Sequence, residues 1–572
     1  MKDVWKVLSR IFGYYPVNYS VITLIRIFGY AGLGLLSGLA IKRFFDYAAA
    51  SALTPGIVYE IAALLIVIPL IQALTYSIDL ALSYGWTEII RSYFRRNLFR
   101  FVLEKPGATP LPVSHGKLTN ILRSDVGVPE SLMWDIPYFL AYAVFSICGL
   151  VMLAAIDWTA TAALFSPLLL TVAAMRWLKR RIAFHYDRQQ LTSDRFLGML
   201  SDMFRHHEAI RINNAVNAFM ERLGAVGEER AEAGKRNAVF NTVLASVYDN
   251  IVNVGTALLL LTIGTKMRTG DFSVGSFTLF LYFLGYVSGT IRLLGTTAAG
   301  FRKTESALAR IRELLGDDHV RKLTAGDSLY LKGELPACDE VPLRQDVLQR
   351  IEVRRFTCTY AGTASGIRDI SFSMPRASFT VVTGPVGSGK TTLLRAVLGL
   401  LPASSGELLW NGRAVDSPAR FFVPPVASYV PQVPALFGGT FRDNVLLGYP
   451  DEGRLDDALQ VSVLEDDVRR FPDGADTLLG PNGAALSGGQ RQRVAVARMA
   501  ARQAQLWVLD DSSSALDAET EIRMWERIDA LRRSAGITCL VVSAKPFVLQ
   551  YADQVIALRN GRIDPASSRL LA

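Results

Sequence analysis

The chain has 572 residues, of which 50% are hydrophobic and 20% are charged, and its mean hydropathy is +0.26. This length predicts two or three domains, and the positive mean hydropathy argues against a soluble globular protein. The net charge of +9 would suit nucleic acid, but a basic face beside anionic lipid explains it as well, and we expect no nucleic-acid partner.

An amphipathic stretch and six long apolar segments make up the first half of the chain. Residues 1–18 mix aromatic and basic side chains, which is typical of a helix lying at a membrane surface. Each apolar segment is near or above the roughly 20 residues that a helix needs to cross a lipid bilayer. The segments lie at residues 19–41, 56–82, 136–156, 158–177, 242–265 and 273–296.

Two long basic connections separate these segments. Residues 83–135 carry seven lysines and arginines, and residues 178–241 carry eleven. Positive charge collects on the cytoplasmic side of membranes, so we place both connections and both chain termini there. Their helical pattern predicts helices that project beyond the bilayer and turn near residues 116–123 and 206–211. We expect an integral, multi-pass protein of a bacterial inner membrane.

Four charged residues lie within the apolar segments: Arg26, Asp79, Asp249 and Arg292. A charge at this depth usually faces a partner or a water-filled cavity. Asp249 and Arg292 either pair, line a pathway, or reach the headgroup level, and the sequence leaves these alternatives open.

The second half predicts an α/β nucleotide-binding domain. We expect a transmembrane domain at 1–316, a linker at 317–349 and this domain at 350–572. An apolar strand leads into G-P-V-G-S-G-K-T, and a helical pattern follows, as in a phosphate-binding P-loop. Lys390 would reach the β- and γ-phosphates of a nucleotide, and Thr391 would bind Mg²⁺. The expected phosphate-binding residues are Gly384, Pro385, Val386, Gly387, Ser388, Gly389, Lys390, Thr391 and Thr392.

Further motifs surround the P-loop. Tyr360 ends a strand-like segment and could stack on adenine. Gln432 follows a strand, and Asp510 ends an apolar strand, so Thr391, Gln432 and Asp510 are the expected Mg²⁺ residues. L-S-G-G-Q opens a helix and makes a second phosphate-binding end. Its residues Ser487, Gly488, Gly489 and Gln490, and Asp517 further on, are counted with the nucleotide-binding residues.

The order of these motifs resembles that of the ATP-binding cassette (ABC) transporters, and the resemblance covers the whole chain. It implies a half-transporter of the exporter type, with an all-α six-helix membrane domain followed by an α/β P-loop domain. Two cassettes would enclose two ATP molecules, each held by the P-loop of one chain and the L-S-G-G-Q signature of the other. Ser487, Gly488 and Gly489 would then act on the partner's nucleotide.

Three positions depart from the family pattern. Glu usually follows the strand-ending Asp as the catalytic base, but Asp511 is one methylene shorter and positions water poorly. His usually follows the next strand, where Ala544 has no donor. Pro481 replaces an acid before the signature. The catalytic set is therefore Asp511 as a weakened base, Gln432 and the altered position Ala544.

These departures predict that the chain binds ATP at its own site and hydrolyses it slowly. Its intact signature would complete an active site on a different half-transporter. A homodimer with two slow sites is the alternative. An importer of metal chelates and an ATP-gated lipid flippase would keep the same fold, whereas six spans argue against a P-loop regulator that moves nothing. The transported substrate cannot be read from the residues.

Overall fold

The structure is a computed structural model that describes residues 2–269, 271–326, 329, 346–360 and 365–570. For some helical residues, chiefly between 168 and 187 and between 241 and 252, only the backbone is described. The chain divides into two compact units. The first comprises Met1–Phe99 and Pro112–Leu329, and the second comprises Arg100–Leu111 and Tyr330–Ala572. The short segment Arg100–Leu111 therefore belongs with the nucleotide-binding half, although it is far from that half in sequence.

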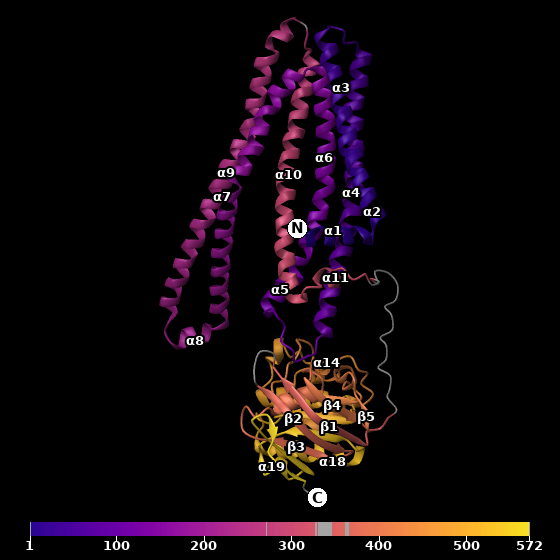
Figure 1. Ribbon diagram of the computed structural model, residues 1–572, viewed down its shortest axis with the longest axis vertical. Helices are drawn as coiled ribbons and strands as arrows, with labels where there is room; N and C mark the ends of the chain where they lie inside the picture. The colour runs from indigo at the N-terminus through magenta and orange to yellow at the C-terminus, as the bar shows by residue number, and fades with distance from the viewer. Residues whose placement is uncertain (1, 270, 327–328, 330–345, 361–364, 571–572) are drawn as a thin grey trace. The chain divides into compact units, whose positions relative to one another are not determined.

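The described part of the first unit is helical. In Figure 1, α7 and α9 run side by side as a long hairpin with α8 at its tip, while α10 packs along α6 and α3. Its elements are α1 (Lys2–Tyr14), α2 (Pro16–Arg26), the π-helix η1 (Ile27–Gly32), α3 (Leu33–Ala49), α4 (Pro55–Glu104), α5 (His115–Arg123), η2 (Asp125–Gly127), α6 (Val128–Ile156), α7 (Trp158–Arg205), α8 (His207–Ile212), α9 (Val216–Thr269), α10 (Val274–Leu315) and α11 (His319–Leu323).

All six apolar segments lie in helices. Among the described residues, four stretches are long and apolar enough to cross a membrane: 16–49, 55–104, 116–156 and 274–315. The other two segments lie in α7 and α9, where part of the side chains fall outside the description. The N-terminal α1 is amphipathic as expected. It buries Val4, Val7 and Ile11, packs against α10, and leaves Trp5 exposed.

The first expected turn was wrong, and the second was placed correctly. Residues 116–123 lie in α5, because the Ser114 side chain accepts the Lys117 amide at 3.3 Å and starts that helix. The chain reverses earlier, at residues 105–114, where Pro106, Pro110 and Pro112 cannot continue a helix. The second reversal occurs at α8, within the expected region.

Two of the four membrane charges form a buried pair. Arg26 and Asp79 are 1% and 0% exposed, and the Arg26 Nε lies 2.9 Å from Asp79 Oδ1. The guanidinium also donates to Ser83 Oγ and to the Trp134 carbonyl, both at 2.8 Å. The expectation that a deep charge faces a partner is therefore confirmed for these two residues.

For the other two membrane charges the alternatives stay open. Arg292 is exposed on α10, and the side chain of Asp249 lies outside the described residues.

Asp79→Ala is expected to destabilise the first unit by about 3–5 kcal/mol, because it leaves the Arg26 charge buried and uncompensated. The measurement is the thermal unfolding midpoint of the purified chain in lipid nanodiscs. Glu60→Ala is the matched control, since its 3.7 Å pair with Arg43 is more than half exposed, and its midpoint should not move. Equal midpoints for the two variants would contradict the prediction.

The second unit contains two sheets. An antiparallel sheet has the order β2-β1-β4-β5, and a larger, mainly parallel sheet has the order β10-β9-β3-β8-β7-β6, with β11 also paired to β9. The strands are β1 (Arg350–Thr359), β2 (Gly366–Pro375), β3 (Phe379–Thr383), β4 (Ser405–Trp410), β5 (Arg413–Ala414), β6 (Ala427–Val430), β7 (Leu506–Asp510), β8 (Thr538–Val542), β9 (Gln554–Arg559), β10 (Arg562–Ile563) and β11 (Arg569–Leu570).

The parallel strands are apolar because both faces of their sheet are covered. Alternate residues enter different cores: Val508 packs with α12 and the antiparallel sheet, whereas Leu509 packs with α17 and α18. The helices are α12 (Lys390–Val397), α13 (Pro418–Phe421), α14 (Phe441–Leu446), α15 (Arg454–Ser462), α16 (Glu465–Arg470), η3 (Gly474–Asp476), η4 (Pro481–Gly483), α17 (Gly488–Ala500), α18 (Ala518–Ala535) and α19 (Pro546–Leu549).

Candidate functional site: a nucleotide-binding edge

Four loops meet at the carboxyl edge of the parallel sheet. β3, β8, β7 and β6 are neighbours in that order and run in the same direction. The P-loop follows β3, Ala544 follows β8, Asp510 ends β7 and Gln432 follows β6. Ligands of open α/β sheets bind at this edge. The fold therefore brings together the sequence motifs that were predicted to form one site.

The P-loop backbone favours glycine at three positions. Gly384, Gly387 and Gly389 have φ values of 141°, 82° and 102°. A Cβ on Gly384 would lie 2.2 Å from the Leu558 carbonyl oxygen, so a side chain has no room there. Gly389 is the N-cap of α12, which places the first amides of that helix at the end of the loop.

The side chains of the P-loop fit a phosphate group. The Lys390 Nζ donates to the carbonyls of Gly384 and Pro385, at 2.8 and 2.9 Å, and so spans the loop. The buried Ser388 Oγ has no hydrogen-bond partner among the described residues. Buried polar atoms are normally paired, so an acceptor in the loop would satisfy this hydroxyl.

The carboxylate expected beside Mg²⁺ lies next to the expected hydroxyl. Thr391 Oγ1 donates to Asp510 Oδ1 at 3.1 Å, and the Tyr429 hydroxyl donates to Asp510 Oδ2 at 3.4 Å. Burial raises the pKa of Asp510, and the Thr391 hydrogen bond opposes that shift. An oxygen pair of this kind suits Mg²⁺. Sequence reasoning did not identify Tyr429 as a partner of Asp510, although Tyr429 lies on β6, three residues before Gln432 in the following loop.

Gln432 contacts the second acid rather than the first. Its Nε2 lies 3.4 Å from Asp511 Oδ2, which is a long hydrogen bond. Asp511 has a φ of 48°, and its amide donates to the Val542 carbonyl at 3.1 Å. Gln432 and Asp511 thus share one corner of the site, while Thr391 and Asp510 share another.

Ala544, the second residue after β8, has no side-chain donor that could take the place of histidine. Ala544 is exposed. The ammonium of the next residue, Lys545, donates to both Glu521 oxygens at 2.9 and 2.8 Å and to the Ser513 carbonyl at 3.1 Å. This buried carboxylate holds the lysine within its own chain, so Lys545 is not free to contact a γ-phosphate.

Tyr360 lies beside the first turn of α12. Its hydroxyl and Thr392 Oγ1 are 3.2 Å apart, and its side chain is 37% exposed. The ring is therefore close to the P-loop, and its stacking on adenine stays a prediction.

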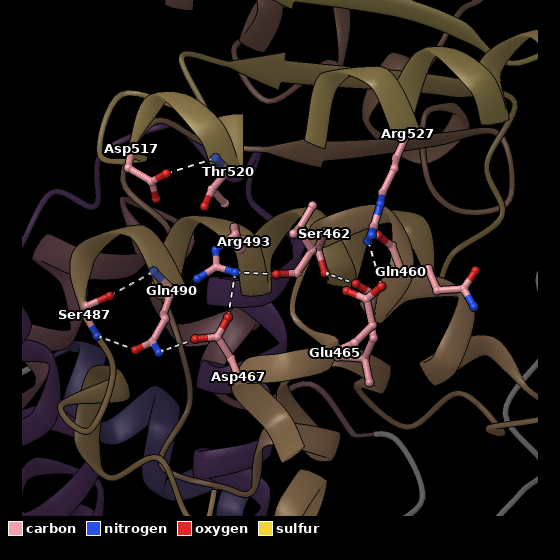
Figure 2. A network of polar contacts seen from close by, with 12 residues as sticks. Gln460, Ser462, Glu465, Asp467, Ser487, Gln490, Arg493, Asp517, Thr520 and Arg527 are labelled. Atoms are coloured by element: carbon pink, nitrogen blue, oxygen red, sulfur yellow. Dashed lines mark hydrogen bonds and ion pairs between the residues drawn. The ribbon is translucent and has the colours of Figure 1, made fainter. Parts of the chain in front are cut away.

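The signature forms a well-capped helix start (Figure 2). Ser487 Oγ accepts the Gln490 amide at 3.2 Å, and Gln490 Oε1 accepts the Ser487 amide at 2.9 Å. This reciprocal capping box occupies the amides of Ser487 and Gln490, and a helix N-terminus of this kind favours an anion. A Cβ on Gly488 would meet nothing nearer than Ala515 Cβ at 3.7 Å, whereas one on Gly489 would lie 2.9 Å from the Ala515 carbonyl.

Two of the expected nucleotide-binding residues have structural roles within this chain. Gln490 uses its side chain in the capping box, and Asp517 caps α18 by accepting the Thr520 amide at 2.9 Å. That hydrogen bond lowers the pKa of Asp517. Contact of either residue with a nucleotide stays a prediction.

Family comparisons agree with this geometry. A model described as "ABC transporter" matches residues 367–514, and one described as "ABC transporter transmembrane region" matches residues 19–291. The chain belongs to the ABC transporters. It is accordingly an integral, multi-pass membrane protein in which a helical transmembrane domain precedes an ATP-binding domain, and it couples ATP hydrolysis to transport.

The relatives of this transporter differ in what their names say they move. An ATP-dependent lipid A-core flippase of Bordetella avium is 26% identical, over 82% of this chain and 77% of that protein. A beta-(1→2)glucan export ATP-binding/permease protein of Rhizobium meliloti is 29% identical, over 56% and 52%. A mycobactin import ATP-binding/permease protein of Mycolicibacterium smegmatis is 34% identical, over 47% and 44%.

A solved structure shares the fold of this transporter. The structure titled as a bacterial Atm1-family ABC exporter with ATP bound has a TM-score of 0.73, at 18% identity, and covers 96% of this chain and 94% of that one. The expected order of domains and the exporter-type fold are therefore confirmed.

Proposed function

We propose that this chain is the degenerate half of a heterodimeric ABC exporter of a bacterial inner membrane. Its own ATP site would bind ATP and hydrolyse it slowly, and its signature would complete the catalytic site of a second half-transporter. The proposal rests on a difference between two sets of residues at the carboxyl edge of the parallel sheet: those that would bind the nucleotide and those that would catalyse its hydrolysis. Lys390 spans the P-loop and Thr391 contacts Asp510, as binding of phosphate and Mg²⁺ would require, but Asp511 is one methylene shorter than glutamate and Lys545 is paired with Glu521.

The residues of this site would bind ATP but would catalyse its hydrolysis slowly. The P-loop amides and Lys390 would hold the phosphates of ATP, and Thr391 and Asp510 would hold Mg²⁺, which supplies positive charge to the phosphate oxygens when bound. Asp511 would have to orient the attacking water, with Gln432 as its neighbour. A carboxylate withdrawn by one methylene, with no donor at Ala544, would orient that water poorly, and errors of about 1 Å can lower a rate about 100-fold.

The signature supports the second part of the proposal. Ser487, Gly488 and Gly489 lie at the start of a 13-residue helix, with the Gly488 position open on this chain. A helix N-terminus favours anions through its dipole and its free amides. These residues would therefore receive the phosphates held by the partner's P-loop.

A contact inside the second unit supports coupling to the membrane helices. The Ala108 amide, just beyond α4, donates to the Leu400 carbonyl at 3.0 Å, and Leu400 follows α12 in the chain. A Cβ on Gly107 would also touch Leu400, at 3.3 Å. The P-loop helix and the end of a membrane-spanning helix are thus joined through one short segment, which would carry movement between them.

Partner, direction and substrate are the open choices within this proposal. A homodimer with two slow sites is the alternative assembly. Export is favoured by the fold, but relatives named as a flippase and as an importer keep both activities as alternatives. Mass spectrometry of the intact transporter from its native membrane separates the assemblies, since a heterodimer contains a second chain mass.

The purified chain without a partner is expected to hydrolyse ATP at a rate on the order of 0.1 s⁻¹ or less, about 100-fold below a common enzyme turnover of roughly 10 s⁻¹. The measurement is steady-state phosphate release in lipid nanodiscs. Lys390→Ala defines the background, because it removes the phosphate-binding ammonium. A background-corrected rate of tens per second would contradict the proposal.

A further inference from the structure

One carboxylate of α16 holds two residues of the signature helix. Asp467 Oδ1 accepts from Gln490 Nε2 at 2.8 Å, and Asp467 Oδ2 accepts from Arg493 Nη1 at 2.7 Å (Figure 2). Gln490 and Arg493 are three residues apart, so both lie on the same face of α17. The Asp467 and Arg493 side chains are 23% and 12% exposed, which limits screening by water. Asp467 therefore joins α16 to α17 through both of its oxygens.

Arg493 also contacts a residue with a strained backbone, Val463. Arg493 Nη1 also donates to the carbonyl of Val463, which lies between α15 and α16. Val463 has a φ of 57°, an unusual value for a β-branched side chain that has to be maintained by its surroundings. The turn from α15 into α16 is thus fastened to α17 by Arg493, beside Asp467.

The contact of Asp467 with Gln490 reaches the cap of the signature. The oxygen and the nitrogen of the Gln490 side-chain amide have different partners. The oxygen accepts the Ser487 backbone amide, and the nitrogen donates to Asp467. Fixing the nitrogen fixes the orientation of the whole side-chain amide, so the oxygen stays directed at Ser487. Without Asp467, the Gln490 side chain can rotate, and one half of the capping box is weakened.

We propose that Asp467 is a positioning residue for ATP hydrolysis in the site that this chain's signature completes. It would act through Gln490 and Arg493, which set the orientation of the α17 N-terminus and of Ser487. It belongs to α16 and is not itself one of the residues at the helix start. This inference rests on the proposed function, because it assumes that the signature faces the partner's nucleotide.

The test uses the transporter assembled with its partner, in lipid nanodiscs. Asp467→Ala is expected to lower kcat for ATP about 10-fold, a fraction of the roughly 100-fold that a full 1 Å displacement can cause. The KM should stay within about twofold, and the stoichiometry of a fluorescent ATP analogue at this chain's own P-loop should be unchanged. Asp467→Glu keeps the carboxylate and should recover kcat to within about threefold of wild type.

The matched control is the neighbouring acid of the same helix. Asp466 is 77% exposed, and its contact with Arg469 is long, at 3.4 Å. Asp466→Ala removes the same charge from the same helix but contacts neither Gln490 nor Arg493 in the described structure, so its kcat should match wild type. An equal loss in both variants would show that net charge is responsible and would overturn the inference.

Gly488→Asp is measured in parallel to separate the two proposals. If Gly488→Asp abolishes hydrolysis while Asp467→Ala retains wild-type kcat, the inference about Asp467 fails and the proposed function stands. If Gly488→Asp leaves hydrolysis intact, the signature does not serve the active site and both fail. If analogue binding falls in proportion to kcat in Asp467→Ala, Asp467 serves folding only, and the inference is also overturned.

Discussion

Gly488→Asp is expected to reduce ATP hydrolysis by the assembled transporter by roughly 100-fold or more, in line with losses seen when a charge-stabilising group at a reacting centre is removed. Gly488 is the first residue of α17, where the helix dipole and the free amides favour an anion. An aspartate there places like charge against the partner's phosphates. The measurement is steady-state ATPase, alongside the nucleotide occupancy of each site.

The structure makes this variant interpretable. A Cβ at 488 meets nothing nearer than Ala515 Cβ at 3.7 Å, so the substituted chain should fold and bind ATP at its own P-loop. Gly488→Asn is the matched control, because it has the same shape without the charge, and it should lose less activity than Gly488→Asp. If Gly488→Asp kept full turnover while Lys390→Ala destroyed it, the active and inactive sites would have to be exchanged.

Asp511→Glu combined with Ala544→His is expected to raise the single-turnover rate at this chain's own site by about 10- to 100-fold, because it restores a longer carboxylate and a γ-phosphate contact. Ala544 is exposed, so a histidine can be accommodated. Asp511 has a φ of 48°, which glutamate tolerates less well than aspartate, and this strain of about 1 kcal/mol should reduce the gain. The readout is phosphate release from a single round of bound ATP.

The two substitutions should be more than additive, since they act on one transition state. Adding Lys390→Ala to the double variant is the control, because a gain that arises at this site must disappear when its phosphate lysine is removed. If the double variant matched wild type in both rate and nucleotide affinity, another feature would disable the site. Pro481, which begins η4 just before the signature, would be the next residue to change.

The sequence by itself determined the membrane helices and the phosphate-binding loop. Bilayer crossing depends on a continuous apolar length, and the P-loop is one uninterrupted stretch from Gly384 to Thr392, so both signals are local. The meeting of Thr391 with Asp510 was also predictable, although 119 residues separate them. Thr391 lies after β3 and Asp510 ends β7, and the carboxyl ends of these strands share one edge of the sheet.

Only the tertiary structure decided which polar side chains are partners. Arg26 is paired with Asp79, Lys545 with Glu521, and Asp467 with Gln490 and Arg493. A sequence shows that each charge must be satisfied, but many opposite charges are available, and the choice depends on how helices pack and rotate against each other. For the same reason, the structural tasks of Gln490 and Asp517 as helix caps emerged only when helix starts were located to the residue, since a cap is defined by the backbone geometry around it.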